Sequence, residues 1–337
     1  MSRQGVEAKP LWSAVPLAVR REVEALAGAQ VTRGARIWGG YGPAPTFRLR
    51  LADGRGLFFK GVHGDSNEFS RQAHERERRV YEELQAYITP WAPRFYGSVA
   101  QGDWRVMLLE DLGPKSAPPW TPALARAAAC GFADFHATTL GRELPAWLGT
   151  FAEDAAKLSW ERVEVETEGL RRVAELAGAS ADDALVWLRA ASPILDRATR
   201  AALDVPGPYA LIHGDLRSDN LRLTQGHLRI FDWPAIQSGF PEFDIAEFAQ
   251  SVETDGGPEA EQVARWYAER LPVRAEALEA ALAWIAAYFA FHCWRPEIPG
   301  LPRLRRFQRQ QFGVTLRWLA QRLGLPEPAW VAALTGD

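Results

Sequence analysis

Cysteine is scarce in this sequence: the chain of 337 residues has two, Cys130 and Cys293, and both fall in apolar segments with helical spacing. Neither belongs to a CxxC pair, so the spacing provides no zinc site and no disulfide framework. We expect both thiols to be buried and inert in a reducing compartment.

Long apolar runs are also missing. The first thirty residues contain charges and lack the apolar core of a secretory signal, and no uninterrupted apolar stretch is long enough to span a bilayer. The 39 basic and 42 acidic residues give a net charge of −3, which excludes a strong overall field for nucleic acid or membrane. These features predict a cytoplasmic protein with no nucleic-acid and no membrane partner.

Lysine is rare in this sequence as well. Only four of the 39 basic residues are lysines, namely Lys9, Lys60, Lys115 and Lys157, so each of them is more informative than usual. What the chain does have is 47% apolar and 24% charged residues, which is typical of a globular protein that can bury a sizeable core. Its length leaves room for two lobes.

The first 110 residues combine strand and helix patterns. Strands are expected at 46–51, 56–62, 95–99 and 104–109, and helices at 15–28 and 67–88. An Asp-Gly pair between the first two strands and a Gly-Asp pair between the last two indicate hairpins. We therefore expect a small β-rich lobe here.

The segment 111–119 is rich in proline, breaks both patterns and is the best candidate for a linker. Beyond it, helices are expected at 121–140, 151–177, 181–203, 244–252, 258–270, 274–293 and 303–324, with strands at 209–212, 221–224 and 227–231. The predicted fold class is α+β with two lobes: a β-rich N-terminal lobe at 1–110 and a larger, mainly helical C-terminal lobe at 120–337.

The segment LIHGDLRSDN, residues 211–220, places many polar side chains in one short loop after a strand. The sequence that follows alternates around Gln-Gly and predicts a hairpin, which would return Asp232 toward the loop. We expect His213, Asp215, Asn220 and Asp232 to converge. Two carboxylates and an amide oxygen suit Mg²⁺ rather than zinc, and substrate phosphates usually complete a magnesium site.

The alternative is that these side chains only cap their own backbone, because Asp and Asn readily bind neighbouring N–H groups. Such a structural role is the one we expect for Asp219. It is also expected for Asp244, which precedes IAEFAQSV and would make a good N-cap for a helix. For Asp215 and Asn220, the presence of Asp232 behind a hairpin favours the catalytic interpretation.

The spacing His213-Gly214-Asp215, four residues, Asn220, followed by a strand that ends in Asp232-Trp233, resembles the catalytic core of aminoglycoside phosphotransferase-like and choline kinase-like enzymes. Gly214 stands where protein kinases carry the Arg of His-Arg-Asp. The resemblance implies the protein kinase-like fold. It also implies transfer of the γ-phosphate of ATP, or of GTP, to a hydroxyl of a small molecule.

The resemblance also implies roles for single residues. Asp215 would be the catalytic base, and Asn220 and Asp232 would hold Mg²⁺. His213 would buttress the loop through hydrogen bonds, and Arg217 would contact a phosphate.

A kinase also needs a lysine on a strand and a glutamate on the next helix. Lys60 lies among apolar residues in GLFFKGV, where a lysine would serve to contact the α- and β-phosphates. On the helix expected at 67–88, Glu77 falls on the apolar stripe between Ala73 and Val80. A carboxylate on that side needs a cation, so we predict a Lys60–Glu77 ion pair.

Two further segments would meet the nucleotide. The loop that begins with Gly39 and Gly40 lies where kinases cover the phosphates, but it is not a GxGxxG, and an ordinary hairpin loop is an equal alternative. The segment MLLEDLG is similar to the family's hinge, whose backbone meets adenine, and places that contact at Leu109, Glu110 and Asp111.

The acceptor region stays open between three features: the aromatic segment 280–294, the acidic run 160–170 and the loop 251–259. Two rival classes also remain. A catalytically inactive kinase-like binding module would lack one of the key residues, and all of them are present. A protein kinase would need a long activation segment, for which the twelve residues from Asp232 to Asp244 leave no room.

Overall fold

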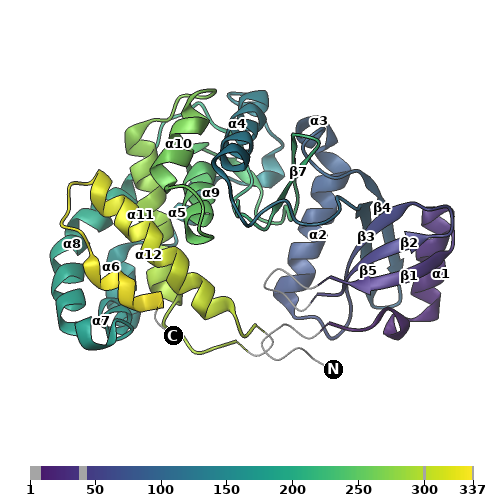
Figure 1. The fold of residues 1–337 in the computed structure, drawn as a ribbon, viewed down its shortest axis with the longest axis horizontal. Helices are drawn as coiled ribbons and strands as arrows, with labels where there is room; N and C mark the ends of the chain where they lie inside the picture. Colours follow the sequence, from purple (N-terminus) through teal and green to yellow (C-terminus); the bar gives the residue numbers. More distant parts are fainter. Residues whose placement is uncertain (1–8, 38–43, 299–300, 336–337) are drawn as a thin grey trace. The chain divides into compact units, whose positions relative to one another are not determined.

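The structure is a computed structural model that describes residues 9–37, 44–298 and 301–335 (Figure 1). Its contacts divide the chain into two units. The first contains Met1–Ser116, Asp219–Ala235 and Ile298–Arg303, and the second contains Ala117–Ser218, Ile236–Glu297 and Leu304–Asp337. Each unit is described by itself. The predicted phosphate-loop residues Gly39 and Gly40 lie outside the described residues, and the boundaries 1–110, 111–119 and 120–337 remain a prediction.

An antiparallel sheet of five strands forms the centre of the first unit, in the order β1-β2-β3-β5-β4. The strands are β1 (Val31–Arg36), β2 (Thr46–Leu51), β3 (Gly56–Val62), β4 (Phe95–Gln101) and β5 (Trp104–Glu110). Both predicted hairpins are confirmed, because β2 pairs with β3 and β4 pairs with β5. Strand β1 reads VTRGAR, in which apolar and polar residues do not alternate. It becomes the edge strand of the sheet through its pairing with β2.

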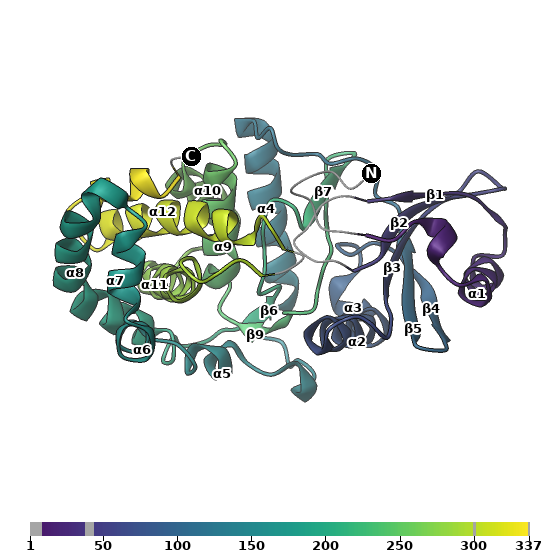
Figure 2. The same cartoon turned by 90° about the horizontal axis from the view of Figure 1, so that it is seen from below.

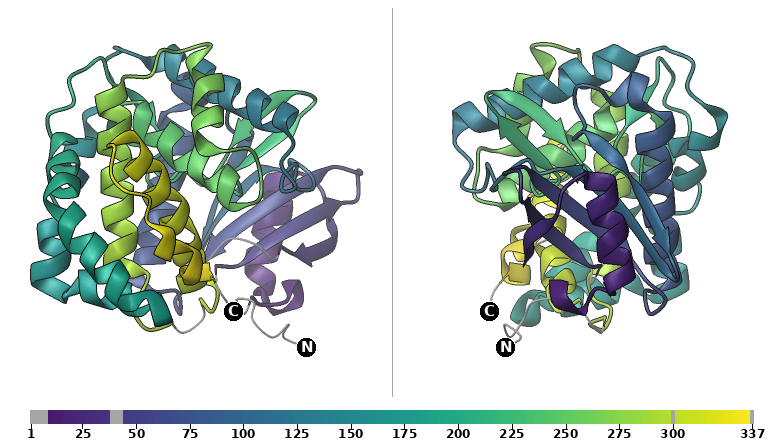
Figure 3. Two further views of the ribbon diagram at one scale, coloured as in Figure 1. Left: turned by 60° about the vertical axis from the view of Figure 1, so that its left-hand side comes forward. Right: turned by 90° about the vertical axis from the view of Figure 1, so that its right-hand side faces the viewer.

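The two faces of this sheet differ because side chains alternate along each strand. Helix α1 (Leu17–Ala27), preceded by the short 3-10 helix η1 (Trp12–Ala14), covers one face (Figures 2 and 3). There Val19 packs in a buried cluster with Phe47 and Phe59, whose rings are 5.4 Å apart. The neighbouring residue Lys60 therefore belongs to the opposite face, which carries the cavity described below.

Helix α2 (Glu68–Glu83) lies on that opposite face (Figure 2). It begins at Asn67, whose side chain accepts a hydrogen bond from the Ser70 N–H at 2.7 Å, as an N-cap does. The single helix expected at 67–88 is wrong in one respect: the backbone leaves the helical region at Leu84, with φ of −107°, and a separate turn α3 (Gln85–Ile88) follows.

The predicted hairpin at 221–231 is present as β7 (Leu221–Thr224) and β8 (His227–Ile230), with Leu221 opposite Ile230. It belongs to the first unit. The Ile230 N–H donates to the Trp91 carbonyl at 2.8 Å, and Ser116 Oγ accepts from the Leu223 N–H at 2.9 Å. The hairpin is thereby joined to segments more than a hundred residues earlier in the chain.

The second unit is mainly helical. It contains α4 (Pro122–Thr139), α5 (Phe151–Ala155), α6 (Trp160–Thr167), α7 (Gly169–Glu175), α8 (Ala181–Ala201), α9 (Glu242–Thr254), α10 (Ala260–Ala268), α11 (Ala275–His292) and α12 (Leu304–Arg322). Short 3-10 helices lie at η2 (Ala146–Leu148), η3 (Gly178–Ser180) and η4 (Ala329–Thr335), and β6 (Ala210–Ile212) pairs with β9 (Gln237–Gly239). Helix α11 is the central one and packs against α8, α9 and α12 (Figure 2).

Two expectations for this unit are wrong. The helix expected at 151–177 is three helices, because Ser159 caps the start of α6 and Glu168, with φ of 52°, ends it. The N-cap expected at Asp244 is wrong because α9 already begins at Glu242, behind Pro241. Asp244 lies instead within the first helical turn and is fully buried.

In the part of the chain that the structure describes, no helix combines the length and the apolarity that a membrane crossing requires.

Candidate active site

A triad of charged side chains lies on the cavity face of the first unit. The Lys60 Nζ is 2.5 Å from Glu77 Oε2 and 2.6 Å from Asp232 Oδ1. Strand β3 supplies the lysine, α2 supplies the glutamate, and Asp232 follows β8. The predicted Lys60–Glu77 pair is therefore present, and Asp232 completes what we call the lysine triad.

Burial decides how strongly the members of the lysine triad depend on one another. The Glu77 side chain is 1% exposed and that of Lys60 is 19% exposed. Burial by itself lowers the pKa of Lys60, but the negative charges of Asp232 and Glu77 override it and hold the pKa above its ordinary value. Burial raises the pKa of Glu77, and Lys60 opposes that shift. The ammonium is thus a permanent positive charge.

The hairpin β7–β8 brings Asn220 and Asp232 to the same end. The Phe231 N–H donates to the Asn220 carbonyl at 3.0 Å, so the residue before Asp232 is tied to Asn220. Asp232 itself has φ of 70°, in the left-handed region that residues other than glycine rarely adopt. Backbone strain of this kind occurs mainly at functional sites, where the surrounding structure maintains it.

A cavity of ≈ 370 Å³ in the first unit is lined by Lys60, Glu77, Asn220 and Asp232. The predicted hinge residues Leu109, Glu110 and Asp111 line the same cavity. The two acidic side chains of this hinge are held by arginines. Arg48 Nε is 2.7 Å from Asp111 Oδ2, and Arg229 Nη2 is 2.5 Å from Glu110 Oε2. The volume is in the range of pockets that hold a cofactor-sized ligand.

The donor set of this cavity fits Mg²⁺. Asp232 contributes a carboxylate and Asn220 an amide oxygen, and both are hard oxygen ligands. Among the described residues there is no cluster of three or more His, Cys, Asp and Glu side chains that would hold a metal alone. Two oxygen ligands in an open cavity match the usual manner of holding Mg²⁺, in which substrate phosphates and water supply the remaining ligands.

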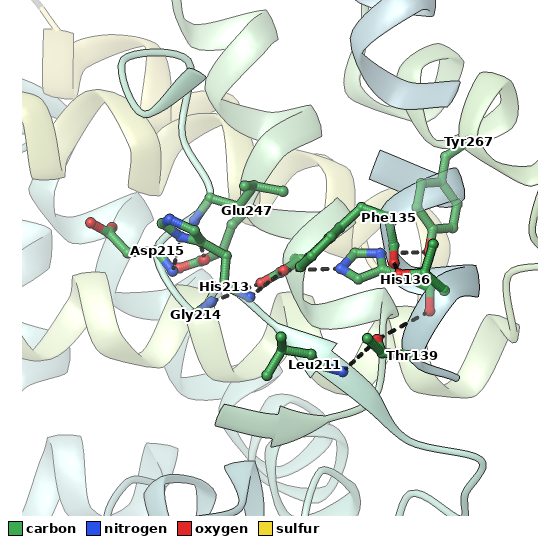
Figure 4. A network of polar contacts seen from close by, with 12 residues as sticks. Phe135, His136, Thr139, Leu211, His213, Gly214, Asp215, Glu247 and Tyr267 are labelled. Atoms are coloured by element: carbon green, nitrogen blue, oxygen red, sulfur yellow. Dashed lines mark hydrogen bonds and ion pairs between the residues drawn. The ribbon is translucent and has the colours of Figure 1, made fainter. Parts of the chain in front are cut away.

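The loop that follows β6 belongs to the second unit and carries the other predicted residues (Figure 4). His213 is fully buried, and its Nδ1 accepts a hydrogen bond from the Asp215 N–H at 3.3 Å. Asp215 Oδ1 is 3.1 Å from Arg217 Nη1, and the Arg217 guanidinium lies over the Phe307 ring, 5.2 Å from its centroid. The structure therefore places Arg217 against the proposed base.

One face of α9 holds the backbone of this loop. The Asp244 carboxylate accepts hydrogen bonds from the N–H groups of His213 at 2.6 Å and Gly214 at 2.9 Å. Glu247 Oε2 accepts from the Leu216 N–H at 2.9 Å. Ser251 Oγ accepts from the Ser218 N–H at 3.1 Å. We call Asp244, Glu247 and Ser251 the α9 anchor.

The α9 anchor is supported in turn by α4 and α10. His136 Nε2 lies 3.0 Å from Asp244 Oδ2, and its Nδ1 lies 2.8 Å from the Tyr267 hydroxyl (Figure 4). Thr139 Oγ1 accepts a hydrogen bond from the Leu211 N–H at 3.0 Å. Side chains of α4 and α9 thus bind backbone N–H groups at both ends and in the middle of this loop, namely those of Leu211, His213, Gly214, Leu216 and Ser218.

The sequence interpretation did not identify the α9 anchor. A signal exists, because positions 244, 247 and 251 are spaced by three and four and so form a polar stripe along one face of the helix. Glu247 is the least obvious member. Burial and the nearby carboxylates of Asp215 and Asp244 raise its pKa well above the ordinary value.

The acidic run 160–170 is engaged by arginines and by backbone within the second unit. Glu161 pairs with Arg200, Glu166 Oε1 lies 2.7 Å from Arg162 Nε, and Glu168 pairs with Arg171. Glu164 Oε2 accepts a hydrogen bond from the Leu170 N–H at 3.2 Å. These are the contacts of a solvated helix face.

The lysine triad with its oxygen donors, and separately the anchored loop, match parts that phosphotransferases use. The profile of the phosphotransferase enzyme family (APH) matches residues 34–279, most of the chain. The protein belongs to this family, as the resemblance in its loop predicted.

Solved structures show the same fold. The chain is similar to choline kinase LicA from Streptococcus pneumoniae, with a TM-score of 0.56, 13% identity, and coverage of 90% of this chain and 98% of that one. For a thermostable mutant of aminoglycoside phosphotransferase APH(4)-Ia the values are 0.53, 15%, 95% and 100%. For a protein assigned as a fructosamine-3-kinase from Thermobifida fusca they are 0.51, 21%, 89% and 99%. The predicted α+β, protein kinase-like fold is confirmed. No curated protein sequence matches the chain.

Proposed function

We propose that this protein transfers the γ-phosphate of ATP, or of GTP, to a hydroxyl group of a small molecule. The observation that carries the proposal is the lysine triad, in a cavity that Asn220 also lines. A permanently charged ammonium, a buried glutamate that orients it and two oxygen donors are the parts that phosphoryl transfer requires, since this reaction depends on positioning and charge neutralisation.

Each residue has a distinct task in this proposal. Lys60 binds the α- and β-phosphates, and Glu77 keeps the ammonium in place. Asn220 and Asp232 hold Mg²⁺, which neutralises phosphate charge when it is bound. Leu109, Glu110 and Asp111 meet the base of the nucleotide.

Asp215 accepts the proton of the acceptor hydroxyl as the oxygen attacks the γ-phosphorus. A carboxylate can do so only if its position is maintained, which the α9 anchor and the bond from the Asp215 N–H to His213 provide. In this proposal Arg217, whose Nη1 lies 3.1 Å from Asp215 Oδ1, also contacts a phosphate.

The test is Asp215→Asn, measured by release of nucleoside diphosphate and by thermal shift with Mg-ATP or Mg-GTP. We expect turnover to fall by about 10²- to 10⁴-fold, because the amide cannot accept the proton, while the shift with Mg-nucleotide is retained. Asp204→Asn is the matched control, since Asp204 is an exposed carboxylate between α8 and β6.

Two outcomes would reject parts of the proposal. Wild-type turnover in the Asn variant would remove Asp215 as the base. The absence of any thermal response to Mg-nucleotide in the wild-type protein would favour the alternative of a kinase-like binding module without activity.

A further inference from the structure

A hollow in the second unit contains an excess of positive charge. It is lined by Arg172, Arg295 and Arg305, by Trp294, and by Glu166 and Glu168. We call it the arginine hollow. Both glutamates are already engaged by other arginines, Glu166 by Arg162 and Glu168 by Arg171. Arg172 has a carboxylate of its own, Glu175 Oε2 at 3.7 Å from its Nη1, so the excess positive charge rests on Arg295 and Arg305.

Arg305 is the strongest indication of an anion site because this residue is only 8% exposed. Its Nε donates to the Pro296 carbonyl at 3.0 Å and its Nη1 to Gln308 Oε1 at 2.8 Å, and both partners are neutral. Among the described residues it has no carboxylate partner. A buried charge without a counter-charge is costly, so this arrangement favours an anionic ligand.

Arg295 increases the energetic cost of this uncompensated positive charge. Its Nε donates to the Phe291 carbonyl at 2.9 Å, and within the described part of the chain it also has no carboxylate partner. Burial and the like charge of Arg295 lower the pKa of Arg305, which shows that the two guanidiniums lie within electrostatic range of each other. An anion between them would relieve the repulsion and accept charge-assisted hydrogen bonds from both.

Trp294 gives the arginine hollow a flat apolar wall. Arg172 lies 5.8 Å and Arg295 lies 5.5 Å from the centroid of its ring. Guanidiniums held against an aromatic ring keep a defined orientation, which suits a planar anion such as a carboxylate.

Helix α11 connects the arginine hollow with Asp215. Trp284, Tyr288 and His292 follow one another at intervals of four, with ring centroids 5.9 Å and 4.6 Å apart. Tyr288 is 38% exposed. Burial and the charges of Asp215 and Glu247 raise its pKa, and the charges of Arg217 and Arg305 oppose this shift. The helix ends at His292, one turn after Tyr288, and Arg295 follows three residues later.

We propose that the acceptor is an anion: a molecule whose hydroxyl lies at Asp215, whose apolar or aromatic body packs along Trp284 and Tyr288, and whose carboxylate or phosphate binds Arg295 and Arg305. This proposal rests on the proposed function, because it assigns the substrate class of the same kinase. It disfavours cationic acceptors such as amino alcohols.

The test compares three benzyl alcohols whose para substituent is negatively charged, neutral or positively charged: 4-(hydroxymethyl)benzoate, 1,4-benzenedimethanol and 4-(hydroxymethyl)benzylamine. Release of nucleoside diphosphate is measured with each in the presence of Mg-ATP or Mg-GTP. We expect the carboxylate to have a kcat/KM on the order of ten- to a hundredfold above that of the amine, mainly through KM, since hydrogen bonds between charged groups are among the strongest.

Variants then locate the anion. In Arg295→Gln the advantage of the carboxylate over the diol should disappear, because the carboxylate loses a charged hydrogen-bond partner. Arg295→Lys should restore part of it. Arg305→Lys is a second variant. It keeps the positive charge but lacks the planar guanidinium, so it should weaken binding of the carboxylate. Arg265→Gln is the control, because this exposed arginine of α10 does not line the hollow.

Binding without turnover separates this proposal from the proposed function. Benzoate and benzylamine are titrated into the full-length protein labelled with ¹⁵N at tryptophan, and Trp294→Phe identifies the indole signal of Trp294. We expect benzoate to shift this signal and benzylamine to leave it unchanged. Benzoate binding without phosphate transfer to any alcohol would reject the kinase function and keep the anion site. Transfer that prefers the amine, or an unmoved Trp294 signal, would overturn the anion site and keep the kinase.

Discussion

The lysine triad and the α9 anchor are both built around carboxylates, but they use them in opposite ways. In the lysine triad, Glu77 and Asp232 bind a cation, Lys60, and formal charges meet at 2.5 Å and 2.6 Å. In the α9 anchor, Asp244 and Glu247 accept hydrogen bonds from backbone N–H groups that carry no formal charge.

This difference follows from what each region must do in the proposed function. A site for phosphates needs a positive charge at a fixed position, so its lysine has to remain ionised and accessible. A loop that carries a catalytic base needs a constant backbone position, which several directional hydrogen bonds provide. We therefore expect the lysine triad to respond sharply to the loss of one charge, and the α9 anchor to lose stability in smaller steps.

The largest effect is expected for Lys60→Met. This change leaves Glu77 buried without a cation, and the free energy of unfolding should fall by about 3–5 kcal/mol, as measured by chemical denaturation at pH 7. The double variant Lys60→Met/Glu77→Leu should regain most of this loss, because no buried charge remains. If the double variant is as unstable as the single one, the unpaired charge of Glu77 is not the cause of the lost stability.

Asp244→Ala tests the other side of the comparison. It removes the acceptor of the His213 and Gly214 N–H groups and the partner of His136, so we expect a loss of about 3 kcal/mol. Turnover should fall far more than the affinity for Mg-nucleotide, because the loop and not the cavity is disturbed. Equal losses in both quantities would show that the two regions are not separable in this way.

The stability of the region around the lysine triad should depend on pH because of His74, which lies on α2 one turn before Glu77. It is 3% exposed, neither ring nitrogen has a hydrogen-bond partner among the described residues, and burial together with the charge of Lys60 lowers its pKa to about 4. The unfolded chain binds a proton near pH 6.5 and the folded protein does not. The stability contributed by the neutral ring is therefore fully present above pH 6.5 and is lost as the pH falls toward 4.

His74→Leu should remove this loss. We expect the variant to be about 2–3 kcal/mol less sensitive than the wild type to acidification from pH 6.5 to pH 4, as measured by denaturation at several pH values. His227→Leu, at an exposed position on β8, serves as the control. A His74→Leu protein with the acid response of the wild type would contradict the assignment.

The smallest effect is expected for Ser251→Ala. The Ser218 N–H and hydroxyl lose one partner, which should cost about 1 kcal/mol and lower turnover severalfold. Ser98→Ala, at an exposed position on β4, should change neither quantity. A loss as large as that of Lys60→Met would mean that the α9 anchor is no more tolerant than the lysine triad.

Local patterns were sufficient for much of the fold and for part of the site. Lys60 could be singled out because a charge in an apolar strand has a cost, and Glu77 because its spacing put it on the apolar side of a helix. Asp244 shows the limit. Its neighbours in sequence suggest an N-cap, whereas its role depends on His213, 31 residues before it, and on His136 in α4. No spacing rule relates residues that meet only through packing.

The sequence by itself was sufficient to predict the hairpins, most of the helices, the polar loop at 211–220 and the family to which the protein belongs. These depend on periodicity and turn preference, which act over a few residues. Packing decided which polar groups met, as with Asp232 beside Lys60, 172 residues apart, and the loop on α9. The charge of the arginine hollow also emerges only in three dimensions, because Arg172, Arg295 and Arg305 come from segments that folding alone brings together.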